Sequence, residues 1–225
     1  MDNNYKETQM LKLNKYAREY IENKDKKIDY QKIAKQMKEF SGAEYVMFFI
    51  FDEKGKDFTL SGFEGNKSKI KKAMDIIGYN IIGRKFKYVE SVHERLEKNI
   101  VTKVESLKEL VGDELPETTI SIIEKIFPID HIVVVRITKE EKTIGSFNLV
   151  FYKNQNINDD EMLKLFASQV GLFIDKKNSE QKTIEIKERL ENIIEGTNAG
   201  TWEHNIQTHK EVINTKWAEM LGYKL

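Results

Sequence analysis

The hydrophobic pattern of the chain changes its period at Tyr45. Before that point apolar residues recur every three or four positions among charged ones, which predicts two amphipathic helices. The second of these begins after Asp29, a good helix-capping residue, and ends at Gly42. The run from Tyr45 to Phe51 is aromatic and apolar on both faces, as expected for a strand in the middle of a sheet. The apolar positions of the first helix are Met10, Leu13, Ala17, Tyr20 and Ile21.

Two β-hairpins are expected, because each apolar strand is followed by a turn signal and a second strand. The first joins 45–51 to a strand with Phe58 and Leu60, and the second joins 132–137 to 144–151. Strand side chains alternate between faces. Either Phe48 and Ile50 or Phe49 and Phe51 therefore face the covering helices, and the sequence leaves this open. The expected buried positions are Val46, Phe48, Ile50, Val133, Val135, Phe147 and Leu149.

An insert at 65–126 lies between the hairpins and has a weaker pattern. It predicts short helices near Ile70, Val92, Leu107 and Pro116, and a short strand at 100–101. A further helix follows the second hairpin from Glu161. Because the strands occur in hairpins and not in alternating βα units, we expect an α+β fold, with helices packed on the faces of one antiparallel sheet.

The helix that begins at Glu161 continues past the expected domain as a linker. Residues 176–182 are strongly polar, and then Ile186, Leu190 and Ile193 recur at steps of four and three residues. This is the spacing of a coiled-coil seam. We therefore expect a homodimer that pairs this seam and the first helix, through Met10, Leu13, Ala17, Tyr20, Ile186, Leu190 and Ile193. The alternative is a single solvated linker helix.

Composition removes several classes of function. The 225 residues include 37 Lys and Arg and 37 Asp and Glu, so the formal net charge is zero and no nucleic acid partner is indicated. There is no cysteine, which excludes disulfides and thiol nucleophiles and agrees with a cytoplasmic location. No run is long and apolar enough to predict membrane contact by this segment. No catalytic motif, metal site or cofactor is evident.

Four stretches of the first 176 residues resemble GAF domains of bacterial and archaeal sensor kinases. They are the central strand Val46–Phe51, the segment Ile82–Phe86, the hairpin strand Ile144–Leu149, and Gln169–Leu172 in the helix that follows. The resemblance covers 29–176 and implies that any small ligand lies between the sheet and the insert. The lining that we expect on this basis is Phe63, Ile82, Phe86, Val135 and Phe147.

The identity of a ligand stays open, because the known signatures of the family are not met. The Asn-Lys…Phe…Asp-Glu signature of cyclic-nucleotide-binding members is represented only by Phe51-Asp52-Glu53, at a hairpin turn. Members that attach a bilin do so through a cysteine, and this chain has none.

The end of the chain resembles the beginning of a PAS domain, as found in sensor histidine kinases and diguanylate cyclases. The similar segments are 190–208 and 214–223. We expect two short strands, then a helix capped by Asn214 that buries Trp217 and Leu221. At His209, where family members usually have glycine, we expect a turn without positive φ. Only about 30 residues follow Glu195, so this domain is incomplete.

The predicted organisation is an N-terminal helix (1–28), a GAF-like domain (29–176), a signalling linker helix (177–196) and an incomplete PAS domain (197–225). It implies a sensory input module of a two-component histidine kinase or a diguanylate cyclase, with the output domain further along the chain. A ligand-free dimerisation spacer is the first alternative. The second is a small-molecule enzyme similar to the free methionine sulfoxide reductases, which use cysteines that this chain lacks.

Overall fold

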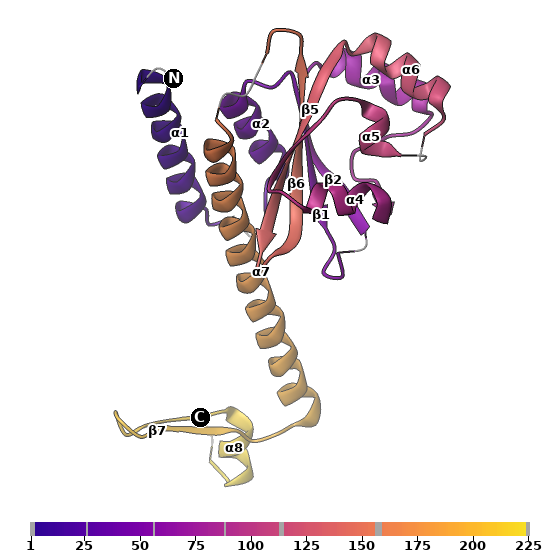
Figure 1. Cartoon of the computed structure of the whole chain (residues 1–225). Helices are drawn as coiled ribbons and strands as arrows, with labels where there is room; N and C mark the ends of the chain where they lie inside the picture. Colours follow the sequence, from indigo (N-terminus) through magenta and orange to yellow (C-terminus); the bar gives the residue numbers. More distant parts are fainter. Residues whose placement is uncertain are drawn as a thin grey trace. The chain divides into compact units, whose positions relative to one another are not determined.

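The computed structural model of the chain describes residues 3–25, 27–55, 57–87, 89–112, 115–155 and 159–223. The chain divides into two compact units, Met1–Asp175 and Lys176–Leu225. The first unit contains an antiparallel sheet with helices on both faces (Figure 1), which confirms the predicted α+β fold. The second contains the rest of the long helix α7, a hairpin and a short helix.

The sheet of the first unit has six strands in the described residues, and neighbouring strands are all antiparallel. The predicted hairpins form its centre, where Phe147 lies opposite both Phe48 and Val135. Across the sheet the order is β3 (Lys85–Lys87), β2 (Asp57–Glu64), β1 (Tyr45–Phe51), β6 (Lys142–Tyr152), β5 (Ile129–Lys139) and β4 (Val101–Val104).

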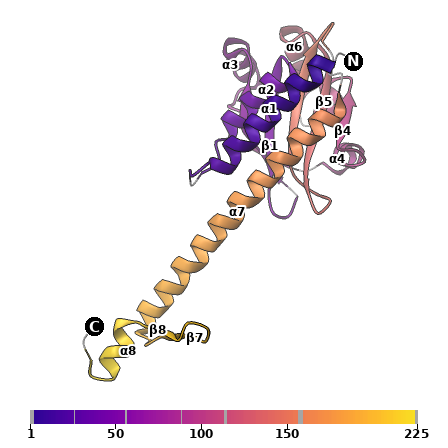
Figure 2. The same cartoon turned by 90° about the vertical axis from the view of Figure 1, so that its left-hand side faces the viewer.

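Three helices cover one face of this sheet: α1 (Asn3–Glu22), α2 (Tyr30–Ser41) and the first part of α7 (Asp160–Thr197). Figure 2 shows α1, α2 and α7 in front of the strands. Phe48 and Ile50 face these helices, whereas Phe49 lies on the opposite side of the sheet. Of the seven expected core positions, Ile50 is partly buried and the other six are buried.

The predicted cap and stop of α2 are present. The Asp29 carboxylate accepts a hydrogen bond from the Lys32 backbone N–H at 2.9 Å, and Gly42 ends the helix with φ +71°. The start of α2 lies directly on β2 at Gly62, where an added Cβ would be 2.5 Å from the Tyr30 carbonyl oxygen. A glycine at this position therefore sets the spacing of the helix from the sheet.

Gln31 joins α2 to β2 through the backbone of Phe63. Its Nε2 donates to the Phe63 carbonyl at 2.8 Å, and the Phe63 N–H donates to its Oε1 at 3.1 Å. Strand β3 does not extend as far as Phe63, since it pairs only with residues 57–59 of β2. The two hydrogen bonds from Gln31 take the place of those that a neighbouring strand would make there.

The insert covers the other face with α3 (Lys67–Ile77), α4 (Glu90–Glu97), α5 (Leu107–Val111) and α6 (Glu117–Ile126). These helices appear to one side of the sheet in Figure 1, opposite α1 and α2. Strand β3 was not predicted, because it has three residues and two of them are charged and exposed.

The second unit contains the hairpin β7 (Trp202–Asn205) and β8 (Lys210–Ile213), followed by α8 (Thr215–Met220). Asn214 caps α8 by accepting from the Trp217 N–H at 2.9 Å, as predicted. Two expectations were wrong. His209 has φ +54°, the left-handed conformation that glycine adopts with less strain. Leu221 is 55% exposed, because the described residues of this unit form no second layer over it.

The described helices include none that is both long and apolar enough to cross a membrane.

Candidate ligand cavity

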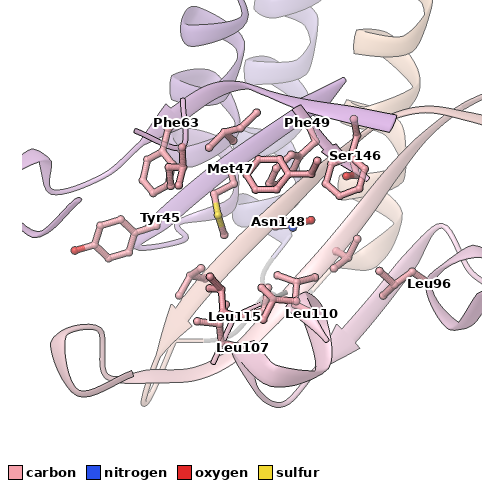
Figure 3. A pocket seen from close by; sticks show the side chains of 18 of the residues that line it. Tyr45, Met47, Phe49, Phe63, Leu96, Leu107, Leu110, Leu115, Ser146 and Asn148 are labelled. Atoms are coloured by element: carbon pink, nitrogen blue, oxygen red, sulfur yellow. The ribbon is translucent and has the colours of Figure 1, made fainter. Parts of the chain in front are cut away.

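A cavity of about 210 Å³ lies between the sheet and the insert. It forms because β1, β6 and β5 present one continuous face, while the insert covers that face with short helices. In Figure 3, Leu107, Leu110 and Leu115 of the insert lie across the space from Met47 and Phe49 of β1.

Aromatic rings lie at both ends of the β1 side of this cavity. At the start of β1 the Tyr45 ring contacts the Phe127 ring edge to face, with 5.0 Å between centroids. At its other end Phe58 stacks on Phe86 at 5.7 Å and meets Phe49 edge to face at 5.5 Å. The cavity is therefore apolar over most of its surface.

Polar side chains enter from β5 and β6. Ser146 and Asn148 are two residues apart on β6 and share the face that lines the cavity. The Asn148 Oδ1 is buried and accepts no hydrogen bond from the described part of the chain. Arg136 on β5 donates through Nε to the Thr143 hydroxyl at 2.9 Å and through a second nitrogen to the Glu97 carbonyl. Arg136 thus links the sheet to the end of α4.

The resemblance implied five lining residues, and the structure places two of them in the lining of the cavity. Phe63 and Phe86 line the cavity. Ile82 is 43% exposed and is not among the lining residues. Val135 and Phe147 lie in the core between the sheet and the terminal helices, on the opposite face, so their expected position was wrong. The physical reason is strand alternation, because the cavity face carries the neighbours Val134, Ser146 and Asn148.

Sequence reasoning did not find Asn148 or the leucines of the insert. A signal for Asn148 was present, since Ser146 and Asn148 are polar residues at alternate positions of an otherwise apolar strand. Such a pattern places polar groups on one face of a buried strand. For the leucines the sequence predicted a short helix near Leu107, but α5 has only five residues, too few to show which side chains face the sheet.

Helix α1 packs within the first unit and is not a separate element in front of it. Leu13 and Tyr20 are buried, at 1% and 7% exposure, in the core that the helices form with the sheet. The Tyr20 ring stacks on Phe173 of α7 at 4.8 Å. The expectation that Leu13 and Tyr20 face a second protomer was therefore wrong, because α2 and α7 cover them. Ala17 is partly buried and Met10 is 42% exposed.

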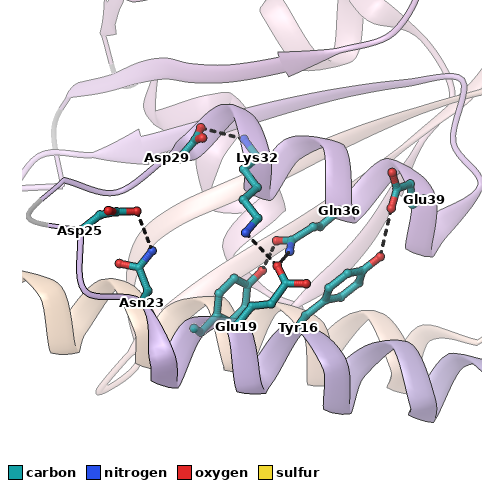
Figure 4. Close-up of polar contacts among 9 residues, drawn as sticks. Tyr16, Glu19, Asn23, Asp25, Asp29, Lys32, Gln36 and Glu39 are labelled. Atoms are coloured by element: carbon teal, nitrogen blue, oxygen red, sulfur yellow. Dashed lines mark hydrogen bonds and ion pairs between the residues drawn. The ribbon is translucent and has the colours of Figure 1, made fainter.

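Polar contacts fix α1 to α2 over the same interface (Figure 4). The Tyr20 hydroxyl donates to the Gln36 Oε1 at 2.8 Å, and Gln36 donates to Glu19 at 3.0 Å. Lys32 completes the chain of contacts with an ion pair to Glu19 at 2.8 Å. Burial raises the pKa of Tyr20 above its usual value, and the neighbouring Tyr16 and Glu19 raise it further.

The three linker positions on α7 are exposed, at 67% for Ile186, 55% for Leu190 and 51% for Ile193. Leu165 and Leu172, earlier on the same helix, are exposed as well, and they fall on the same alternation of three and four residues. The described residues contain no group of three or more histidine, aspartate and glutamate side chains placed to hold a metal ion.

Solved structures of similar fold include GAF domains. The GAF domain of an Acinetobacter phosphoenolpyruvate-protein phosphotransferase has 13% identity and a TM-score of 0.52, over 80% of this chain and 97% of that one. The phycoerythrobilin-bound GAF domain of a cyanobacterial phytochrome has 12% identity and a TM-score of 0.56, over 77% and 97%. A segment of a methyl-accepting chemotaxis protein has 15% identity and a TM-score of 0.52, over 72% and 96%.

No protein-family model matches the sequence, and no curated protein matches it. At these identities the comparison concerns the fold alone, and it places the first unit in the GAF-like fold class.

Proposed function

We propose that this chain is a sensory or regulatory input module whose GAF-like unit binds a small molecule in the cavity between the sheet and the insert. The observation that carries the proposal is the apolar cavity of about 210 Å³, whose lining includes the buried Asn148 Oδ1, an oxygen that accepts no hydrogen bond from the described residues. The solved structures of similar fold support a sensory role, since they come from a phytochrome, a chemotaxis protein and a phosphotransferase.

We propose no catalytic role for this segment. An enzyme similar to the free methionine sulfoxide reductases would need a cysteine nucleophile, and the chain has no cysteine. The same composition and the zero net charge support a cytoplasmic module without a nucleic acid partner.

We propose that residues 197–225 begin a PAS-like domain, after a linker helix at 177–196 and the GAF-like domain at 29–176. The support is the apolar surface that this short segment leaves open. A hairpin and one helix bury little, and a larger domain would cover such side chains. The exposed residues are Trp202, Ile206, Val212, Met220, Leu221 and Tyr223. The resemblance of this segment to sensor proteins supports a histidine kinase or diguanylate cyclase output domain as its partner.

We propose that the module is a homodimer that pairs α7 with its copy. The exposed apolar positions Leu165, Leu172, Ile186, Leu190 and Ile193 support this seam. A change in the cavity would then pass along α7 to the PAS-like segment. Met10, on the exposed side of α1, would add to the pairing, whereas the buried Leu13 and Tyr20 would not.

The test of ligand binding is a panel of small metabolites from several chemical classes, scored by ligand-observed NMR and by thermal shift. It compares the full chain with a Leu110→Trp variant, in which a larger ring occupies the cavity. A matched control is Leu11→Trp, at a position of α1 that is 65% exposed. We expect at least one compound to bind the parent and Leu11→Trp, and not Leu110→Trp.

The spacer alternative predicts a different outcome. No compound would bind any of the three proteins, and Leu110→Trp would melt at a higher temperature than the parent because the ring fills an unused space. That result would remove the sensory proposal.

A further inference from the structure

Asn148 brings an amide group into apolar surroundings. Its side chain is 6% exposed, and its pairing partners on the two neighbouring strands are Met47 and Val134. Its Oδ1 receives no hydrogen bond from any described residue. A buried amide oxygen without a donor is costly, so native structures rarely keep one unless a ligand or water supplies the bond.

The size of the cavity limits what can supply that bond. An engineered apolar cavity of about 150 Å³ holds one benzene molecule. A volume of about 210 Å³ therefore has room for one substituted ring or a fused pair of small rings. The surrounding rings of Tyr45, Phe49 and Phe63 favour a flat, aromatic occupant, which can stack on them or meet them edge to face.

The charge of the occupant follows from the same lining. An ionised group would have to leave water for walls made mostly of Leu, Ile, Val and Phe side chains, which is unfavourable without a dedicated counter-charge. Arg136 is the cationic side chain of β5 in the lining. Its guanidinium donates to the Thr143 hydroxyl and to the Glu97 carbonyl, and these bonds hold it against the sheet and α4.

We infer that the cavity binds an uncharged aromatic molecule of one or two rings, whose hydroxyl or N–H group donates a hydrogen bond to the Asn148 Oδ1. This inference rests on the proposed function, because it names the ligand class of the same cavity. Figure 3 shows Asn148 on the sheet side of the space, facing the region that Leu107, Leu110 and Leu115 close.

The experiment uses phenol, toluene and benzoate as probes with the full chain, and measures each dissociation constant by calorimetry and ligand-observed NMR. Phenol and toluene have nearly the same shape but differ in the donor. Benzoate adds a negative charge. We expect phenol to bind at least 10-fold more tightly than toluene, and benzoate to bind more weakly than phenol.

Asn148→Leu tests the assigned residue with little change of volume. We expect this variant to lose the preference for phenol and to bind toluene as well as or better than the parent does. The control Asn178→Leu, at an exposed position of α7, should keep the parent's preference. The phenol-to-toluene ratio of the parent is informative by itself, so the test does not depend on the variant folding.

Equal affinity for phenol and toluene, or tighter binding of benzoate, would overturn the inference. The proposed function would stand in that case, provided that the preferred compound binds the parent and not Leu110→Trp. If neither these probes nor the metabolite panel bind the parent, both the inference and the proposed function fail.

Discussion

At the scale of single residues, Gly62 determines how closely α2 lies on the sheet. An added Cβ would meet the Tyr30 carbonyl at 2.5 Å and the Ala34 Cβ at 3.1 Å. Both are parts of a packed helix, so neither can move without moving α2. The position therefore couples a strand beside the cavity to the terminal helices.

We expect Gly62→Ala to destabilise the protein by about 1–3 kcal/mol, because the methyl group overpacks the contact between α2 and β2. Gly196→Ala is the matched control. Nothing lies within 4 Å of its added Cβ, and alanine favours the helix by up to about 1 kcal/mol. Urea unfolding measures both. Equal midpoints for the two variants would show that α2 does not lie so close to β2.

Two tyrosines of α1 make stability depend on alkaline pH. Burial raises the pKa of Tyr16 to about 12, with a further contribution from Glu39, and burial also raises that of Tyr20. A tyrosine in the unfolded chain ionises near pH 10. Because the folded pKa is the higher one, the stabilising contribution is complete below about pH 10 and is lost as the pH rises toward the folded value.

We therefore expect the free energy of unfolding to fall between pH 10 and 11.5, and to fall less steeply in Tyr20→Phe. That variant also loses the hydrogen bond to Gln36, which costs about 1 kcal/mol at pH 8. Urea titrations at several pH values measure both effects. An unchanged slope in Tyr20→Phe would mean that its hydroxyl is hydrated in the folded state.

Residue-level prediction from the sequence succeeded where one local rule decides the outcome. Asp29 and Asn214 cap the helices for which they were chosen, since an N-cap depends only on the next few residues. Val135 and Phe147 were assigned to the wrong face, because the alternation rule gives two sets of side chains but does not say which set the helices cover.

At the scale of elements, α1 is a layer of the first unit. Its Leu13, Tyr16 and Tyr20 side chains belong to the same core as Phe166 and Phe173 of α7. The sequence correctly predicted the apolar stripe of α1, but it did not show which surface covers that stripe. An amphipathic helix has the same pattern whether its own domain or another protomer covers it.

We expect Leu13→Ala to destabilise the protein by about 2–5 kcal/mol, because it opens a cavity in that core. Leu11→Ala is the control for helix propensity and hydrophobicity. Leu11 is 65% exposed on the same helix, so its replacement should change stability by less than about 0.5 kcal/mol. Similar small effects from both substitutions in chemical denaturation would contradict the packing of α1.

The two hairpins were predictable because their strands are long apolar runs joined by turn signals, and the first part of α7 because it has a helical period. In the insert the sequence predicted short helices near Val92 and Leu107 and a strand at 100–101. The elements α4, α5 and β4 have only eight, five and four residues, too few to show which of their side chains face the sheet. The cavity lies against this insert, so its leucine lining could not be predicted from the sequence.

At the scale of the whole molecule, the proposed dimer depends on the exposed seam of α7. Paired in parallel, two copies would bury Ile186, Leu190 and Ile193 against each other. A glutamate at these positions would face its own copy, and like charges at such a contact oppose association.

We expect the parent to sediment as a dimer at about 10 µM, and Ile186→Glu with Leu190→Glu to sediment as a monomer with the first unit still folded. Gln181→Glu with Asn192→Glu is the matched control. It adds the same two charges to exposed positions outside the seam and should stay dimeric. A monomeric parent, or a seam variant that still dimerises, would contradict this mode of pairing.

The amide of Gln31 also protects the protein from self-association of another kind. It occupies the N–H and C=O of Phe63 on the outer side of β2, beyond the end of β3. Open strand edges recruit strands from other molecules and start aggregation. We expect Gln31→Ala to expose this edge and to shorten the lag time of fibril formation seen by thioflavin fluorescence. Gln31→Glu keeps one acceptor for the Phe63 N–H, so its lag time should fall between those of the parent and Gln31→Ala. Solubility in storage would then depend on a single surface side chain.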